Sequence, residues 1–330
     1  MARIAVIGAG LAGLTVAREL RDHADVCVFE KARGVGGRMA TRYAGEDFEF
    51  DHGAQFFTAR SAAFCEFLAP LVADGTVAPW LARFAELQGP RTTSSRTWTL
   101  EYPHYVGVPR MNAVGKALAV GLDIRLSSRV TEVDFADGRW SLAFEGPSGP
   151  ERAGGFDWLV VTAPLPQSLA LLGDVDGLGD AAGARSMLGC YALMLGFAEP
   201  PELDFDAALV READISWISV NSSKPGREAP GTLLVHATNR WADAHMEDDP
   251  GRVQAHMLSE VSRVAGVDPD AAVHKALHRW RFANLPKQPG PPCYFSKEQR
   301  LGVAGDWWVQ GRVEAAFRSA RALVDCIRDA

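Results

Sequence analysis

Three glycines near the amino terminus, Gly8, Gly10 and Gly13, have the spacing of a turn that binds the pyrophosphate of a dinucleotide. The first glycine permits a sharp reversal, the second lets the backbone approach the phosphates, and the third allows a helix to pack closely on a strand. Backbone amides at the start of a helix carry partial positive charge, so they can hold two phosphates without a lysine. We expect these glycines and the neighbouring Leu11 and Ala12 to contact a nucleotide cofactor.

The segments around this turn form a complete βαβ unit. Residues 3–7 are rich in β-branched apolar side chains, which predicts a buried strand, and apolar residues then recur at helical spacing over 14–20. A second apolar strand, 26–29, ends at Glu30, whose carboxylate can accept hydrogen bonds from both hydroxyls of an adenosine ribose. A glycine-rich turn without a ligand is the alternative, but the complete unit favours a dinucleotide.

The composition is that of a folded globular protein, with 47% apolar and 23% charged residues in a chain of 330. This length exceeds that of a usual single domain, so two lobes are expected. The 34 basic and 41 acidic residues give a net charge of −7, which does not favour binding to nucleic acid. The longest apolar runs, 4–17 and 187–198, are shorter than the roughly 20 residues of a membrane span, so no membrane partner is expected.

The cysteines are odd in number, far apart and without a CxxC pair: Cys27, Cys65, Cys190, Cys293 and Cys326. This pattern favours a reducing, cytoplasmic environment, and it provides no metal-ligand set. No feature of the sequence implies a protein partner.

The order of the predicted elements indicates an α/β protein. A Rossmann-type cofactor-binding domain is interrupted by an inserted α+β substrate domain that consists of an antiparallel sheet plus helices. Strands within 124–133, 140–144 and 158–162 are expected to return to the opening sheet. The cofactor domain is assigned residues 1–59, 104–165 and 279–330, and the substrate domain residues 60–103 and 166–278.

The loop after Glu30 distinguishes between dinucleotides. The sequence Gly36-Gly37-Arg38 at this distance resembles the second fingerprint of the amine-oxidase-like superfamily of FAD enzymes. The resemblance implies non-covalently bound FAD, with Arg38 against its pyrophosphate and Arg33 on the adenosine side. Lys31, Gly37 and Met39 are assigned to the same cofactor-binding loop.

Two later segments resemble further cofactor motifs of that superfamily. In Gly305-Asp306, the aspartate is implied to hold a ribitol hydroxyl, and the helix start that includes Val313 and Ala316 is implied to face the flavin pyrimidine. A helix amino terminus favours the negative charge that a flavin gains at N1 and O2 on reduction. The segment 128–131 resembles the one that brackets the adenine, which makes Val130 the candidate there.

Three segments, 51–60, 103–107 and 278–283, together resemble the renalase family and its bacterial relatives. This resemblance implies oxidation of the 2- and 6-dihydro isomers of NAD(P)H, with FAD passing electrons to O2 to form hydrogen peroxide. Such a donor becomes aromatic when it delivers hydride to flavin N5, so no general base is needed. We therefore assign no catalytic side chain and no metal.

The substrate side of the flavin is assigned to residues from both lobes. The turn contributes Ala54 next to the cofactor and Gln55 next to both ligands, and the remaining assignments to the substrate are Phe56, Phe57, Thr58, Ala59, Trp98, His236, His245 and Trp280. For each isolated histidine or tryptophan, a packed residue with its polar atom satisfied is the alternative.

Arg312 separates the candidate substrates. Amine oxidases commonly present an aromatic side chain at this position after the glycine, whereas a guanidinium repels a cationic amine and can pair with a pyrophosphate. Two alternatives stay open: a flavin amine oxidase or desaturase of the same superfamily, and a non-catalytic FAD-binding redox sensor.

Overall fold

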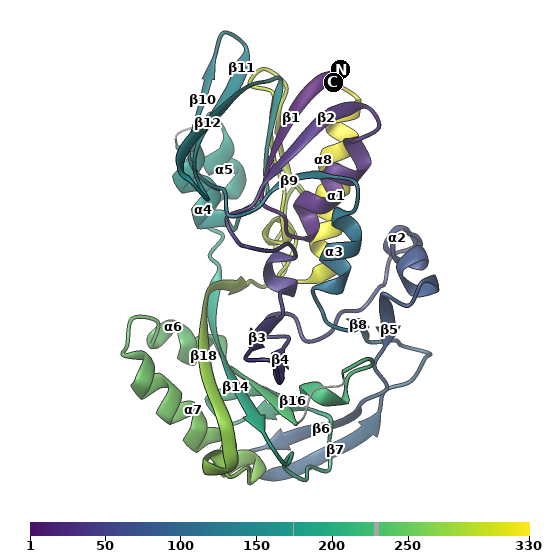
Figure 1. Ribbon diagram of the computed structural model, residues 1–330, viewed down its shortest axis with the longest axis vertical. Coiled ribbons are helices and arrows are strands. Elements are labelled where there is room, and N and C mark those ends of the chain that lie inside the picture. Colours follow the sequence, from purple (N-terminus) through teal and green to yellow (C-terminus); the bar gives the residue numbers. More distant parts are fainter. Residues whose placement is uncertain (174, 228–230) are drawn as a thin grey trace.

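The computed structural model describes residues 1–173, 175–227 and 231–330, which form an elongated molecule with two lobes (Figure 1). One lobe contains a six-stranded sheet in the order β19-β20-β13-β1-β2-β9. Its central strand β1 (Ala2–Ile7) is parallel to β2 (Ala24–Phe29) on one side and to β13 (Trp158–Val161) on the other. The expected α/β architecture of Rossmann type is confirmed.

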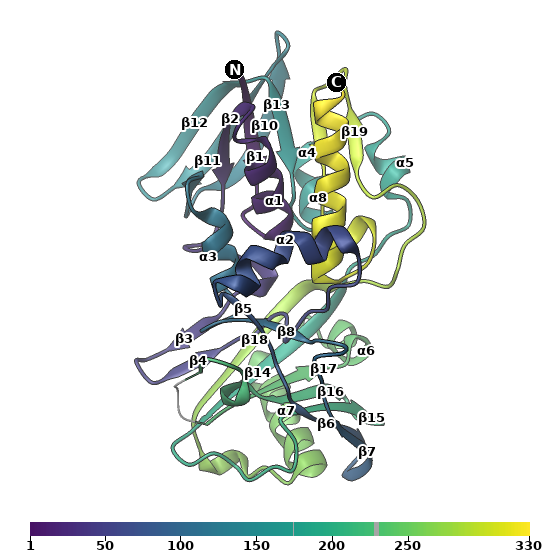
Figure 2. The same ribbon diagram turned by 90° about the vertical axis from the view of Figure 1, so that its right-hand side faces the viewer.

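Both ends of the chain build this sheet. The strands β9 (Asp123–Arg125), β19 (Tyr294–Ser296) and β20 (Leu301–Val303) complete it, and α8 (Val313–Arg328) packs beside α1 (Leu11–Leu20) on one face (Figure 1). Arg321 Nη1 and Arg328 Nη2 donate to Glu19 Oε1 and Oε2 at 2.6 and 3.2 Å, which ties the last helix to the first. Both termini lie at the same end of this lobe (Figures 1 and 2).

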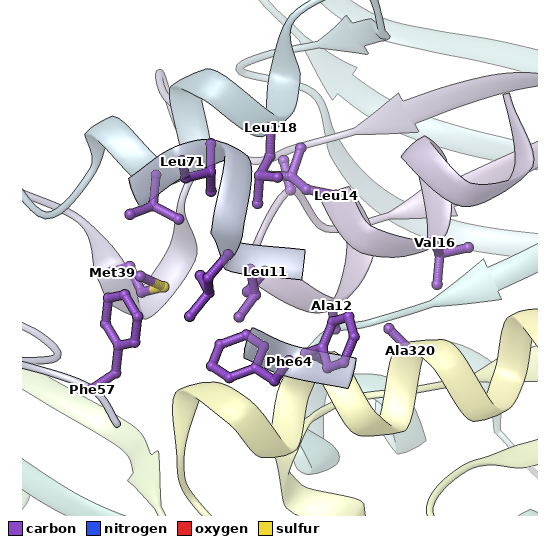
Figure 3. Close-up of a cluster of buried hydrophobic side chains, with 14 of the residues drawn as sticks. Leu11, Ala12, Leu14, Val16, Met39, Phe57, Phe64, Leu71, Leu118 and Ala320 are labelled. Carbon is purple, nitrogen blue, oxygen red and sulfur yellow. The ribbon is translucent and has the colours of Figure 1, made fainter. Parts of the chain in front are cut away.

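A hydrophobic cluster fills the space between α1, α8 and α2 (Ala62–Ala73). Leu11, Ala12, Leu14 and Phe64 are buried there (Figure 3), because apolar side chains three and four residues apart share one face of a helix. The helix α2 crosses the front of this lobe in Figure 2. This packing fixes the start of α1, and with it the glycine turn, in the lobe.

Strands β10 (Arg129–Ala136), β11 (Arg139–Gly146) and β12 (Gly149–Phe156) form a separate antiparallel sheet. The expectation that all strands between 124 and 162 return to the opening sheet is right for β9 and β13 but wrong for β10 and β11. A tight turn at Asp137 and Gly138, both with positive φ, reverses the chain, so β11 pairs with its neighbour in sequence.

The second lobe contains a seven-stranded sheet in the order β18-β14-β17-β16-β15-β6-β7. Its strands are β18 (Ala272–Asn284), β14 (Leu188–Phe197), β17 (Thr232–Ala237), β16 (Ile215–Val220), β15 (Ala207–Arg211), β6 (Arg83–Gln88) and β7 (Arg91–Thr97). The expected antiparallel arrangement holds for every neighbouring pair except β15 and β6, which are parallel. The sheet is therefore mixed, because β6 enters from an earlier excursion of the chain.

The two faces of this sheet are covered differently. Helices α6 (Asn239–Ala244) and α7 (Pro250–Ala265) cover one face, and the hairpin of β3 (Arg42–Ala44) and β4 (Phe48–Phe50) lies on the other, between the lobes (Figure 1). The remaining elements are β5 (Val77–Pro79), β8 (Tyr105–Gly107), α3 (Ala113–Ala119), α4 (Leu165–Leu172), α5 (Leu178–Ala182) and the short 3-10 helices Gly37–Met39, Asn221–Ser223, Pro269–Ala271 and Asp306–Trp308.

We propose that the two lobes correspond to the domains assigned from the sequence, with residues 1–59, 104–165 and 279–330 in the cofactor domain. The helices α2, α4 and α5, which fall in the segments assigned to the substrate domain, pack against the cofactor lobe instead. Within the described ranges, every helix is too short or too polar to cross a membrane.

Candidate cofactor and substrate site

The glycine turn is shaped by backbone contacts. Gly8 has φ of +104°, and its amide donates to Phe29 O at 2.8 Å. A Cβ on Gly13 would lie 1.9 Å from Gly8 O, so only glycine fits there. A Cβ on Gly10 would instead meet no atom within 4 Å, so Gly10 faces open space at the start of α1. This open backbone surface is suited to the pyrophosphate of a dinucleotide.

Glu30 is held at the end of β2. Its Oε2 accepts from the Ala9 amide at 2.7 Å and its Oε1 from the Ala32 amide at 2.8 Å. The carboxylate is thereby oriented, and each oxygen keeps a lone pair for a ribose hydroxyl. The Ser128 amide donates to Glu30 O at 2.8 Å, which places Val130, the adenine candidate, two residues from this contact.

The second cofactor loop lies on the glycine turn. The Gly36 amide donates to Ala9 O at 2.8 Å, and Gly37, with φ of +55°, would bring a Cβ to 3.2 Å from Gly10 Cα. Lys31 and Arg33 are exposed at the edge of this loop, and Lys31 Nζ donates to Gln167 Oε1 at 3.0 Å.

Arg38 and Asp306 join the two ends of the chain. The guanidinium donates to both oxygens of Asp306, at 2.9 and 2.5 Å, and also to Ala283 O at 2.9 Å. The Gly305 amide donates to Ser319 Oγ at 2.9 Å, which fixes the turn before Asp306. The residues assigned to the pyrophosphate and to the ribitol are therefore side by side.

The start of α8 lies next to the end of β18. The Gly311 amide donates to Leu285 O at 2.9 Å, and a Cβ on Gly311 would lie 2.5 Å from Asn284 Cβ. Arg312 follows with an exposed side chain, and the flavin-facing candidates Val313 and Ala316 are half-buried in the first turn.

The turn 51–57 connects the cofactor side with the substrate lobe. The Ala54 amide donates to Arg38 O at 2.9 Å. His52 O accepts from Trp280 Nε1 at 2.8 Å and lies 3.2 Å from His236 Nε2. Two of the residues assigned to the substrate side, Trp280 and His236, are thus brought to this turn.

An aromatic wall next to this turn consists of His52, His278 and Trp280. The ring of His52 stacks on Trp280 at 5.0 Å, and His278 meets their edges at 4.7 and 4.4 Å. Burial and the nearby charges of His278 and Arg42 lower the pKa of His52 to about 3, and burial and Arg42 lower the pKa of His278 to about 4. Both imidazoles are neutral at physiological pH. The sequence assignment omitted them, although His278 alternates with Trp280 on one strand.

A second aromatic cluster surrounds Phe56. Its ring lies 4.9 Å from Trp98, 5.0 Å from His104 and 5.5 Å from Trp217. Trp98 stacks on His104 at 3.7 Å, with the planes 8° apart. Phe56 and Trp98 are thus brought together as expected, and His104 and Trp217 join them.

Several assigned side chains lie elsewhere. The carboxamide of Gln55 is occupied, because Oε1 accepts from Ser219 and Lys224 while Nε2 donates to Asp51 O and Gly53 O. Its expected contact with a ligand is therefore corrected to a structural role.

His245 lies on the helical face of the seven-stranded sheet, where Nδ1 is 2.7 Å from Asp248 Oδ2, so its expected place at the substrate is wrong. The reason is that it ends α6, which packs on the face opposite Trp280. The side chains of Leu11, Ala12, Met39 and Phe57 point into the hydrophobic cluster (Figure 3), so only their backbone is available to a cofactor. Thr58 and Ala59 are half-buried after Phe57.

The sequence does not predict a buried polar cluster that lies at the junction between the two lobes. Asp51, Lys224 and Arg227 have side chains that are 1%, 0% and 2% exposed. Lys224 is 173 residues from Asp51 in sequence, and no local pattern indicates that they meet.

Comparisons with known proteins agree with this geometry. Residues 6–71 match the NAD(P)-binding Rossmann-like domain and residues 85–328 the flavin containing amine oxidoreductase family. Mouse renalase (Mus musculus) is 23% identical, with 99% of each chain covered.

Solved structures with the same fold include a variant of putrescine oxidase, with TM-score 0.73, 12% identity and 99% of each chain covered. A p-nitrophenol 4-monooxygenase from Pseudomonas putida DLL-E4 has TM-score 0.64 and 16% identity over all of this chain and 81% of the other. The residues of the glycine turn, Glu30 and the 36–38 loop fit FAD, which is the cofactor.

Proposed function

Since the chain belongs to the flavin containing amine oxidoreductase family and is an FAD-dependent oxidoreductase, we propose that it oxidises the 2- and 6-dihydro isomers of NAD(P)H. The electrons pass to O2, which is reduced to hydrogen peroxide. This substrate class is that of a small-molecule nicotinamide dinucleotide, in agreement with the likeness to renalase over the whole chain.

The observation that carries this proposal is the neutral aromatic wall of His52, His278 and Trp280, with the exposed, cationic Arg42 close enough to lower the pKa of both histidines. Arg312 is a second exposed guanidinium, at the start of α8. Uncharged rings can stack on a dihydronicotinamide, and guanidinium groups attract its pyrophosphate. The same guanidinium groups disfavour a cationic amine.

The protein's part in the reaction is binding and orientation. Bound FAD supplies the hydride acceptor. In this proposal the glycine turn and Glu30 hold the dinucleotide part of the cofactor. Arg38 and Asp306, which are hydrogen-bonded to each other, are the residues proposed for its pyrophosphate and ribitol. The rings of Trp280 and His52 orient the donor, whose own aromatisation drives hydride loss, so the side chains need not remove a proton.

The test is anaerobic mixing of the purified protein with the 6-dihydro isomer of NAD and, separately, with primary amines. We expect the flavin absorbance to bleach rapidly with the dihydronicotinamide and not with amines. Admission of air should then restore the absorbance and release one hydrogen peroxide per flavin. Bleaching by amines alone would establish an amine oxidase instead, and a flavin that no donor reduces would establish a non-catalytic sensor.

A reducing, cytoplasmic location remains part of the proposal. All five cysteines are free thiols, and burial contributes to raising the pKa of Cys27, Cys190 and Cys293 to about 12.

A further inference from the structure

Asp51 is the centre of a buried hydrogen-bond network between the lobes. Its Oδ1 accepts from Thr41 Oγ1 at 2.8 Å and from the Met111 amide at 3.0 Å. Its Oδ2 accepts from Lys224 Nζ at 3.3 Å and from Arg227 Nη2 at 2.5 Å. One carboxylate thereby joins segments of the cofactor side to the loop that follows β16.

Lys224 connects this carboxylate to the turn 51–57. Its ammonium also donates to Gln55 Oε1 at 3.3 Å and to Asn221 Oδ1 at 3.0 Å. All three of its protons therefore have partners, and its side chain is fully buried. Gln55 is in turn tied to the backbone of its own turn at Asp51 and Gly53.

The turn that Lys224 holds also supports the cofactor side. A Cβ on Gly53 would lie 2.0 Å from Arg38 O, and the Ala54 amide donates to the same oxygen. A shift of the turn therefore moves the backbone of Arg38, whose guanidinium reaches Asp306. It also moves His52 and the wall that includes Trp280.

The charges around Lys224 come from several elements. Asp51 pairs with Lys224 directly, and Arg227 pairs with the same carboxylate oxygen of Asp51. His236 on β17 is close enough for the charge of Lys224 to lower its pKa. Arg110 and Glu49 form an ion pair on the side of β4. Burial lowers the pKa of Lys224, as does Arg227, and the opposing effect of Asp51 leaves it at about 8.

We propose that Lys224 is a positioning residue for the flavin side of the site. Its ammonium fixes the turn 51–57 against Arg38 through Asp51 and Gln55, and loss of the ammonium charge loosens that turn. Only the turnover readout of this proposal rests on the proposed function, since the effect on bound FAD does not require a particular donor.

The test compares Lys224→Met with Lys224→Arg as rescue and Lys275→Met as control. Lys275 forms an ion pair of the same 3.3 Å length with Asp270, but at the surface. Lys224→Met keeps Asp51 paired with Arg227, so we expect it to fold and to retain FAD.

The first readout is the visible spectrum of the bound flavin between about pH 6 and pH 10. Wild type and Lys275→Met should show a spectral transition with a midpoint near pH 8, where Lys224 loses its proton. Lys224→Met should show the high-pH spectrum throughout, and Lys224→Arg the low-pH spectrum throughout. Identical pH profiles in wild type and Lys224→Met would overturn the proposal.

The second readout is the rate of flavin reduction at about pH 7, which Lys224→Met should lower by about tenfold at equal flavin content. If Lys224→Met does not fold, Gln55→Glu tests the same link, because a carboxylate next to the ammonium should move the transition to higher pH. An unmoved transition in Gln55→Glu would contradict the proposal. A spectral transition without reduction by any dihydronicotinamide would leave the positioning role intact and refute only the proposed substrate.

Discussion

The glycine turn and the Asp51 network are two parts of the candidate site that differ in the groups they use. The turn offers backbone atoms, and the network consists of buried charged side chains. At the turn, the backbone around Gly13 and Gly10 is usable because side chains are missing. At the junction, Asp51, Lys224 and Arg227 make their contacts through charged side chains that water does not reach. The first region is therefore damaged by added atoms, and the second by a changed charge.

Gly13→Ala should have the largest effect, because the new methyl would lie 1.9 Å from a backbone oxygen that cannot move without distorting the turn. We expect loss of both bound FAD and folded protein. Far-ultraviolet circular dichroism and the ratio of flavin to protein absorbance measure the two losses. A stable, yellow Gly13→Ala protein would show that the turn is not rigid.

Gly10→Ala separates cofactor binding from folding. Its methyl meets no protein atom within 4 Å, and φ of −76° is allowed for alanine, so the apoprotein should keep its thermal stability. The methyl would occupy the surface offered to the phosphates, and FAD affinity should fall by about tenfold or more. Fluorescence titration with FAD checks this. Unchanged affinity would place the pyrophosphate elsewhere.

Asp51→Asn addresses the second region. Burial raises the pKa of Asp51, but Lys224 and Arg227 outweigh burial and lower it to about 2. The carboxylate thus contributes stability above its ordinary pKa, and this contribution is lost as the pH falls toward 2. The variant leaves two buried cations without their anion and should lower the free energy of unfolding by about 3–5 kcal/mol. Unfolding in urea measures this free energy. The control Asp270→Asn, at an exposed ion pair, should unfold with the same free energy as wild type.

Trp280→Ala tests the aromatic wall next to that network. It removes the hydrogen bond to His52 O and one stacking surface, and it should lower the rate of flavin reduction by roughly tenfold to a hundredfold. FAD content should stay unchanged. Trp280→Phe, which keeps a ring, is the matched control in stopped-flow measurements. Equal rates of flavin reduction in wild type, Trp280→Ala and Trp280→Phe would show that the aromatic wall does not contact the substrate.

Arg312→Ala should have the smallest effect, since its side chain is exposed. We expect about tenfold weaker binding of the dihydronicotinamide through KM, with kcat and flavin content nearly unchanged. Steady-state kinetics on isomers with and without the 2′-phosphate measure the change. Loss of FAD with unchanged turnover per flavin would instead assign Arg312 to the cofactor.

The same contrast explains what could be predicted from the sequence. The glycine turn, Glu30 and the 36–38 loop are local patterns in which each residue's role depends on near neighbours, and the structure brings these residues together. The separate sheet that includes β11 was missed because apolar alternation does not indicate which strand is the partner. The family resemblance of segment 278–283 points to Trp280, and the structure brings its ring against His52, together with His278 from the same strand.

The junction could not be read from the chain in this way. Asp51 is separated in sequence from Lys224 by 173 residues and from Arg227 by 176. No local pattern in the sequence predicts that this lysine is buried. The error for His245 has the same origin, because the side of a sheet on which a helix packs is decided by tertiary structure.

The tie between α1 and α8 sets an order for biosynthesis. The cofactor lobe contains β1, which precedes the seven-stranded lobe in the chain, and also β20 and α8, which follow it. During synthesis, the six-stranded sheet and its nucleotide-binding turn therefore stay incomplete until the seven-stranded lobe has been made. The seven-stranded lobe is free to fold first. The complete flavin site can therefore form only after Asp306 and α8 have been made.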